Sequence, residues 1–121
     1  MIASSNMKLL MFERAGGPPE AGVLAAGDSE IIPLAGAGFS CLYSIIQGGA
    51  SALAKVKDFA AQASARVPLN TVRILAPIHR PPKFICIGLN YRDHAIESGM
   101  AIPEIPTVFN KVPNAVSGTG D

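Results

Sequence analysis

The chain has 121 residues, enough for one domain, and its ten Lys and Arg against nine Asp and Glu leave a net charge of +1. Such a balance gives no long-range field that would favour nucleic acid or an anionic membrane, so neither is expected as a partner. Hydrophobic residues make up 49% of the chain and charged residues only 16%, which indicates a surface that a partner subunit or further chain covers.

The N-terminal stretch gives no targeting signal. Residues 1–6 are too short and too uncharged for a signal or transit peptide, and we expect a loose leader there. The location expected for the protein is cytoplasmic, with the mitochondrion left open. No charged residue lies between Glu30 and Lys55, which is long enough for a bilayer span. Pro33 and several glycines interrupt this stretch, so we expect a turn and a buried helix instead.

The first part of the chain, residues 7–80, predicts a small β-rich domain with helices. Short apolar runs over residues 8–13, 21–26 and 30–34 are separated by turns rich in glycine and proline. Three such runs predict three short strands in an antiparallel meander. A further strand is expected over residues 71–76.

Two helices are predicted between these strands, because the apolar spacing changes from strand-like to helical. Gly48 and Gly49 separate them, and Ser40 and Ser51 are the expected N-caps. The apolar positions are Phe39, Leu42, Ile45 and Ile46 in the first helix, and Leu53, Val56, Phe59 or Ala60, and Ala63 in the second.

A second domain is expected from residue 81 to 121, after a connector stiffened by Pro77, Pro81 and Pro82. It opens with the apolar run 84–87, bounded by the prolines and by Gly88, which predicts a buried strand entering a turn. The expected fold class is α+β, a small β-rich N-terminal domain with helices that is followed by this second domain.

The densest cluster of functional side chains follows that turn, over residues 90–97. His94 and Glu97 are three residues apart, so on a helical turn they share a face and can hydrogen-bond. A carboxylate beside an imidazole fixes its tautomer and raises its basicity, which makes the pair a candidate general base for water. The alternative is an exposed helix start, in which Asp93 caps the helix and Glu97 favours its dipole.

The remaining candidates are weaker. Lys111 follows the strand-like residues 107–109 and could bind a carboxylate or stabilise an oxyanion, or it could be a solvated lysine on an edge strand. His79 has no acidic neighbour and is expected at the surface. Cys41 and Cys86 lie in apolar settings and are expected to be reduced core thiols. The acidic residues are scattered apart from Asp93 and Glu97, so no metal site is expected within the chain.

A family resemblance rests on two stretches of the sequence. Residues 83–100 contain the pattern Gly-x-Asn-Tyr-x-x-His-x-x-Glu, and residues 103–111 and 117–121 contain a Phe-x-Lys and a Ser-Gly-Thr-Gly-Asp. Together they resemble the opening of the catalytic domain in the fumarylacetoacetate hydrolase family. Residues 7–82 are similar to the small N-terminal domain of that family's shorter members. The resemblance implies that the second domain is the truncated start of a mainly-β catalytic fold.

The resemblance also implies a function and its residues. The family acts on acylpyruvates or 1,3-diketo acids, by hydrolytic carbon–carbon cleavage or, in relatives, by decarboxylation or isomerisation. His94 and Glu97 would then form the water-activating dyad on a lid-like helical segment. Lys111 would contact the substrate or its oxyanion, and Asn90 and Tyr91 would line the floor of the site. A homodimer is the expected assembly.

One departure from the family pattern concerns the metal. The family enzyme holds Mg²⁺ or Mn²⁺ through a Glu-x-Glu pair and a later Asp, which lie downstream of the 121 residues of this chain. We therefore expect this chain to bind no catalytic metal and to be inactive as a fragment. The alternative function is a non-catalytic truncated module that acts by association with other subunits.

Overall fold

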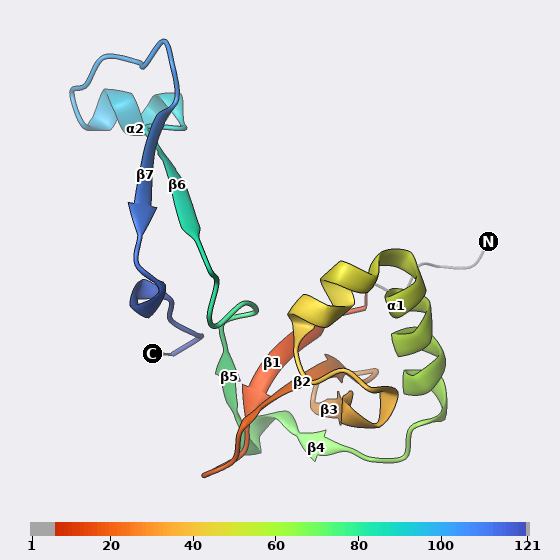
Figure 1. The fold of residues 1–121 in the computed structure, drawn as a ribbon. Coiled ribbons are helices and arrows are strands. Elements are labelled where there is room, and N and C mark those ends of the chain that lie inside the picture. The colour runs from red at the N-terminus through yellow and green to blue at the C-terminus, as the bar shows by residue number, and fades with distance from the viewer. Residues whose placement is uncertain (1–6, 121) are drawn as a thin grey trace. The chain divides into compact units, whose positions relative to one another are not determined.

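The computed structural model describes residues 7–120; the predicted leader at residues 1–6, and Asp121, lie outside the described residues. The chain divides into two compact units (Figure 1). The first unit contains the residues up to His79 together with those from Ser117 onward, and the second contains Arg80–Val116. Residues 117–120, which the sequence placed in the second domain, therefore pack with the first unit.

The first unit is built on a five-stranded antiparallel sheet with the order β4-β3-β2-β1-β5. Its strands are β1 (Leu9–Glu13), β2 (Pro19–Leu24), β3 (Glu30–Pro33), β4 (Val67–Pro68) and β5 (Arg73–Leu75). The predicted meander is confirmed as β1, β2 and β3, and the strand predicted over residues 71–76 is β5. Short 3₁₀ turns, η1 (Ala35–Ala37) and η2 (Leu69–Thr71), complete the unit.

A kinked helix, α1 (Leu42–Gln62), lies against one face of this sheet (Figure 1). Gly49 has φ 56° and ψ −138°, outside the helical region, so the two predicted helices are confirmed on either side of it. The predicted serine caps are wrong. Cys41 holds the N-cap position without a side-chain cap, and the Ser51 hydroxyl donates to the Gly48 carbonyl at 2.9 Å instead of accepting a backbone N–H.

The sheet is apolar on both faces, because successive side chains of a strand point to opposite sides. On the face toward α1, Met11 packs in a cluster with Val23, Ile32 and Leu75 and with α1 residues that include Val56. On the other face, Leu10, Phe12 and Ile31 form a second cluster, which Ile74 and residues around β4 cover. The unit thus has a core on each side of one sheet.

Two predicted apolar positions of α1 are wrong. Ile46, in the first half of the helix, is 64% exposed. Val56 is fully buried, but Leu53 is 41% exposed, and Ala52 takes the buried position in its place. The two residues are neighbours on the helix, and the kink at Gly49 changes which face meets the sheet.

The second unit is an antiparallel hairpin of β6 (Phe84–Gly88) and β7 (Thr107–Lys111). A long connection between them carries the six-residue helix α2 (Arg92–Glu97), and the 3₁₀ turn η3 (Pro113–Ala115) follows β7. The pairing runs from Phe84 opposite Lys111 to Gly88 opposite Thr107. The helix therefore lies at the Gly88 end of the hairpin.

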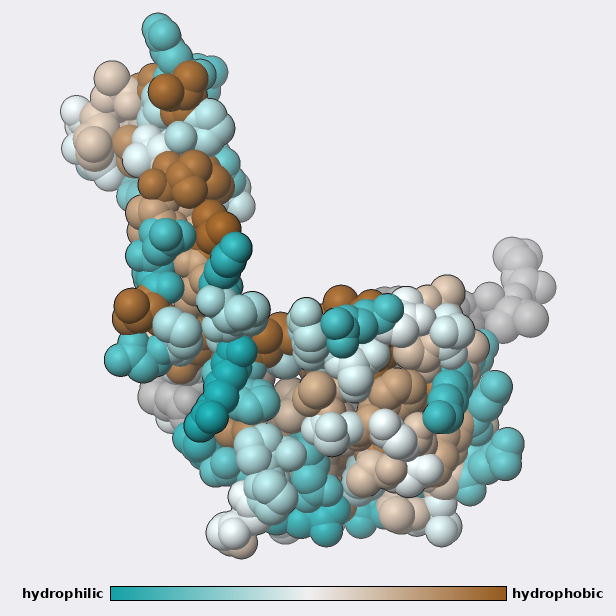
Figure 2. Space-filling view, viewed as in Figure 1, coloured by the Kyte–Doolittle hydropathy of each residue, from teal (hydrophilic) through white to brown (hydrophobic). Residues whose placement is uncertain are grey.

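The prediction that residues 84–87 form a buried strand is wrong for this chain. The strand exists, but Ile85 is 59% exposed and Val108, on β7, is 60% exposed. Hydrophobic residues line the surface of the second unit (Figure 2). Among the described residues, the hairpin consists of two strands only, so neither of its faces is covered as a face of the first sheet is. No helix within residues 7–120 is long and apolar enough to cross a membrane.

A pair of truncations on α1 tests the observed packing. Val56→Ala removes two buried methyl groups, so we expect the free energy of unfolding to fall by about 2 kcal/mol in urea denaturation followed by circular dichroism. Leu53→Ala, three residues earlier on the helix, should change it by no more than about 0.5 kcal/mol. A larger loss at Leu53 than at Val56 would contradict the helix orientation.

A second pair tests the seating of α2. Ala95 is 1% exposed whereas its neighbour Ile96 is 67% exposed. Ala95→Gln puts an amide where no room is left, so the protection of the Met100 amide, which donates to the Ala95 carbonyl at 2.9 Å, should fall about tenfold in hydrogen exchange. Ile96→Gln should leave that protection unchanged. Equal effects of the two substitutions would show that α2 is not seated through Ala95.

Candidate functional site

The predicted dyad lies on the connection between β6 and β7. Strand β6 ends at Gly88, and Leu89 turns the chain with a φ of 47°, in the left-handed region that non-glycine residues seldom adopt. Asn90 and Tyr91 follow, and α2 begins at Arg92. A sharp turn of this kind at a strand end directs the following residues away from the line of the strand, and such backbone strain often accompanies functional segments.

Helix α2 is closed at its C-terminal end rather than at its start. Tyr91 occupies the N-cap position and makes no side-chain capping bond, so Asp93 is not the cap but an acidic residue in the first turn, where the helix dipole favours it. Gly99 has a φ of 63°, and its N–H donates to the Ile96 carbonyl at 3.1 Å. This left-handed glycine ends the helix soon after Glu97.

His94 and Glu97 are both exposed on this helix. Their separation of three residues places them on neighbouring turns, as the sequence predicted. Within the described residues 7–120, the His94 imidazole and the Glu97 carboxylate form no hydrogen bond or ion pair with each other. The two groups can approach by side-chain rotation, because an exposed helix surface leaves their rotamers open.

Lys111 is not brought together with the dyad by the hairpin. It pairs with Phe84, whereas α2 follows Gly88, which pairs with Thr107 at the other end. Four residues of strand separate the two ends, a distance of about 13 Å at about 3.3 Å per residue. Lys111 shares its face of the hairpin with Phe84, Cys86 and Phe109, because directly paired residues point to the same side. Among the predicted site residues, only those of the β6–β7 connection are thus neighbours.

The chain's described residues do not fit a divalent metal ion. No group of three or more His, Cys, Asp and Glu side chains within residues 7–120 converges on one point. Magnesium and manganese sites require several oxygen ligands. Glu97 could contribute one oxygen, which is insufficient by itself.

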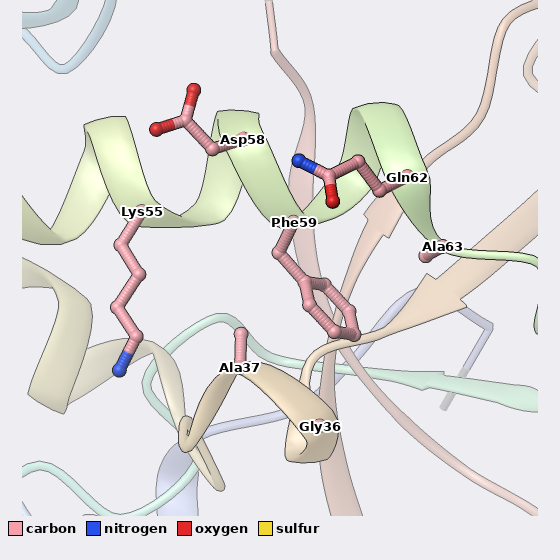
Figure 3. Close-up of a pocket in the computed structure, with 7 residues that line it drawn as sticks. All are labelled: Gly36, Ala37, Lys55, Asp58, Phe59, Gln62 and Ala63. Atoms are coloured by element: carbon pink, nitrogen blue, oxygen red, sulfur yellow. The ribbon is translucent and has the colours of Figure 1, made fainter.

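A hollow on the first unit, which the sequence did not indicate, lies between η1 and the second half of α1 (Figure 3). Its volume is about 360 Å³, and it is lined by Gly36, Ala37, Lys55, Asp58, Phe59, Gln62 and Ala63. The Phe59 ring forms the contact with η1, since a Cβ on Gly36 would lie 2.8 Å from that ring. Lys55, Asp58 and Gln62 come from α1 at helical spacing. Lys55 extends toward η1 (Figure 3), and its Nζ lies 5.4 Å from the centre of the Phe39 ring. The hollow is therefore a groove left by the packing of Phe59 against η1, with polar side chains at its edge.

Cys41 is a half-buried thiol at the start of α1. A backbone hydrogen bond from Ser44 lowers the pKa of this thiol, and the Ser44 hydroxyl lies 3.9 Å from its sulfur. Cys86 is likewise free and half-buried, on β6. His79, expected at the surface, is half-buried in the connector that follows β5. None of the three is near α2 in sequence or in an observed hydrogen bond, so none extends the dyad.

Comparison with known proteins shows what the chain is similar to. No family model matches it. It is 31% identical over 120 residues to "oxaloacetate tautomerase fahd2, mitochondrial" of Xenopus laevis, an alignment that covers 96% of this chain and 38% of the relative. It is 54% identical over 56 residues to "fumarylacetoacetate hydrolase domain-containing protein 2 homolog" of Dictyostelium discoideum, which covers 46% of this chain and 18% of that protein.

A solved structure agrees with these relatives. An HpcE-like protein from Mycobacterium smegmatis matches with a TM-score of 0.62 and 26% identity, over 92% of this chain and 38% of that one. The chain therefore spans well under half the length of the proteins it matches. The mixed α/β fold and both curated relatives point the same way: the chain is similar to part of proteins of the fumarylacetoacetate hydrolase family.

Proposed function

We propose that this chain supplies the small N-terminal domain and the proton-transfer dyad of a fumarylacetoacetate hydrolase family enzyme that acts on a short oxo acid. The observation that carries the proposal is the identity of 54% over 56 residues with a relative named for that family. The second unit would then be the start of the mainly-β catalytic fold. Since the chain spans 38% of its Xenopus relative, the activity belongs to a protein that also contains the rest of the site.

The substrate class follows from what an imidazole and a carboxylate can do together. A carbon between two carbonyl groups carries an acidic hydrogen, and His94 would act as the base that removes it, with Glu97 holding the imidazole in the required tautomer. Return of that proton to the oxygen gives tautomerisation, the reaction named for the Xenopus relative. Removal of a proton from water by the same base gives hydrolytic cleavage of an acylpyruvate.

The remaining predicted residues take supporting roles in this proposal. Asn90 and Tyr91 adjoin α2 and would donate hydrogen bonds to the oxo-acid oxygens. Lys111 lies at the far end of the hairpin from α2, about 13 Å along the strand, which is further than a short oxo acid reaches. Its contact with a developing oxyanion therefore stays an expectation from the family resemblance that the observed register does not support. The family resemblance implies that Mg²⁺ or Mn²⁺ would act as a Lewis acid toward the substrate carbonyl. The described residues do not form its site, so the proposed roles belong to the side chains alone.

The exposure of the dyad bears on when it is active. Both side chains are solvated and not hydrogen-bonded to each other, and catalytic hydrogen bonds in free enzymes often form only when substrate is bound. The proposed base is therefore completed by closure of the β6–β7 connection over the substrate, which would also exclude water from the reacting carbon.

Assembly and location remain proposals. The exposed apolar faces of the hairpin favour a homodimer or cover by further chain, and the same faces are the observation that supports the alternative, a non-catalytic module that associates with other subunits. The Xenopus relative is named mitochondrial, whereas a cytoplasmic location was expected from this sequence.

A chimera tests the proposal directly. The segment of the Xenopus relative that aligns with this chain is replaced by residues 1–121, and interconversion of the keto and enol forms of oxaloacetate is followed by ultraviolet absorbance. We expect the chimera to be active and His94→Gln to lower kcat about 10²- to 10⁴-fold, because general base catalysis contributes that much.

The matched control is His79→Gln, which changes the chain's other histidine in the connector after β5. It should leave kcat within about twofold, by the ordinary tolerance of residues that do not touch substrate. Glu97→Gln should lower kcat, and Glu104→Gln, in the same connection, should not. An active chimera whose rate is the same with and without His94 would refute the assignment of the base.

The metal expectation is tested on the chain alone. Because residues 7–120 bring too few ligands together, titration of the 121-residue chain with MgCl₂ or MnCl₂ in a calorimeter should give no micromolar binding. The active chimera, treated with a chelator and then titrated with the same salts, serves as the comparison. Micromolar binding by the chain that Glu97→Gln abolishes would reveal a metal site that includes this carboxylate.

A further inference from the structure

Gly118 lies directly on the backbone of β5 and of the residue after it. A Cβ atom built on Gly118 would be 2.6 Å from the Ile74 carbonyl oxygen, 3.1 Å from the Leu75 Cα and 3.2 Å from the Ala76 nitrogen. The approach to the Ile74 oxygen is closer than a Cβ atom tolerates and the other two are tight, and all three partners are backbone atoms, which cannot turn aside as a side chain can. Only glycine therefore fits at residue 118 in this arrangement.

The strand under Gly118 is itself fixed. Ile74 and Leu75 pair with Phe12 and Met11 of β1. The Leu75 side chain is buried in the cluster under α1, and Ile74 packs on the opposite core cluster. Because pairing and packing hold β5 on several sides, a side chain at residue 118 would displace the segment 117–120 rather than the strand.

The glycine two residues later has a different reason to be there. Gly120 has a φ of 88° and nothing within 4 Å of a built Cβ, so it serves the turn conformation. Gly118 needs space but has no positive φ. The structure thus requires glycine at these two positions for different reasons.

The contact of Gly118 with β5 lies where the chain returns from the second unit to the first. The chain leaves the first unit at His79, shortly after β5, and returns to it at Ser117. The chain thus leaves the first unit just after β5 and contacts β5 again where it rejoins that unit. Closing a segment at both ends reduces the conformations open to it.

We propose that Gly118 and β5 form a clasp that fixes the return of the β6–α2–β7 segment on the first unit. The partner surface is the backbone of Ile74–Ala76, and the element it takes is the chain's own segment Ser117–Gly120. The clasp goes beyond the proposed function and does not depend on it, since it is a property of the first unit alone.

Hydrogen exchange of the 121-residue chain, read by mass spectrometry or NMR, tests the clasp. In Gly118→Ala, exchange at the amides of residues 73–76 and 117–119 should be about tenfold or more faster, while that of Met11 and Val23 in the central strands should be unchanged. Gly17→Ala is the matched control, because a Cβ there meets only the Arg14 carbonyl, at 3.4 Å, and the Arg14 Cβ, at 3.8 Å, and its φ is not positive. Gly120→Ala should affect only the turn itself.

A second variant covers the case in which Gly118→Ala loses the whole fold. A chain that ends at Val116 lacks the clasp segment and should show the same faster exchange at residues 73–76, with Met11 and Val23 still protected. Unchanged exchange at residues 73–76 in either folded variant would overturn the clasp. The clasp would also be overturned if Gly118→Ala unfolded the central strands while the chain that ends at Val116 showed no change in exchange at β5.

Discussion

Strand β1 connects β5 to the rest of the first sheet, and its backbone and side chains are engaged in every direction. Its backbone pairs with β2 on one side and with β5 on the other, Met11 fills the core under α1, and Phe12 fills the core on the opposite face. Gly22 of β2 makes room for this arrangement, since a Cβ there would collide with Ile31 and approach a Phe12 ring carbon at 3.0 Å. The place of β5, and so of everything attached to it, follows from this pairing.

The second unit has the sequence of internal strands without the cover that internal strands receive. Ile85, Ile87 and Val108 share one face of the hairpin, and Phe84, Cys86 and Phe109 share the other, so both faces are apolar. Strands with this pattern are ordinarily covered on both sides, and a two-stranded hairpin is at best marginally stable in water. We therefore expect this unit to be less stable than the first, whose sheet has a core on each face.

Local chemistry made much of the first unit predictable from sequence. Glycine and proline marked the turns of the meander, and Gly48–Gly49 marked the kink in α1, because these residues change the backbone directly. The exchange of Leu53 for Ala52 in the core could not be foreseen, since it depends on how a kinked helix meets the sheet. The exposure of β6 could not be foreseen either, because an apolar run reports a tendency to be buried and not the presence of a partner.

In the candidate site, too, the features that depend on local sequence could be predicted and those that depend on strand pairing could not. The motif fixed the proximity of Asn90, Tyr91, His94 and Glu97, because all four lie on one connection and helical spacing is a local property. The relation of Lys111 to them depends on strand register, and the observed register places it at the opposite end of the hairpin. The spacing therefore bears on His94 and Glu97 alone, and a role for Lys111 beside them rests on the family resemblance.

The proposed dyad of His94 and Glu97 lies on a helix of only six residues. A helix of six residues is too short to be stable by itself, so α2 depends on the burial of Ala95 and on the glycine that ends it at residue 99. A base carried on such an element is easily reordered when substrate arrives, and two fixed ends limit how far the connection can move while it does so. In the proposals above, the short length of α2 would let the dyad move, and the contact of Gly118 with β5 would restrain the strands that flank it.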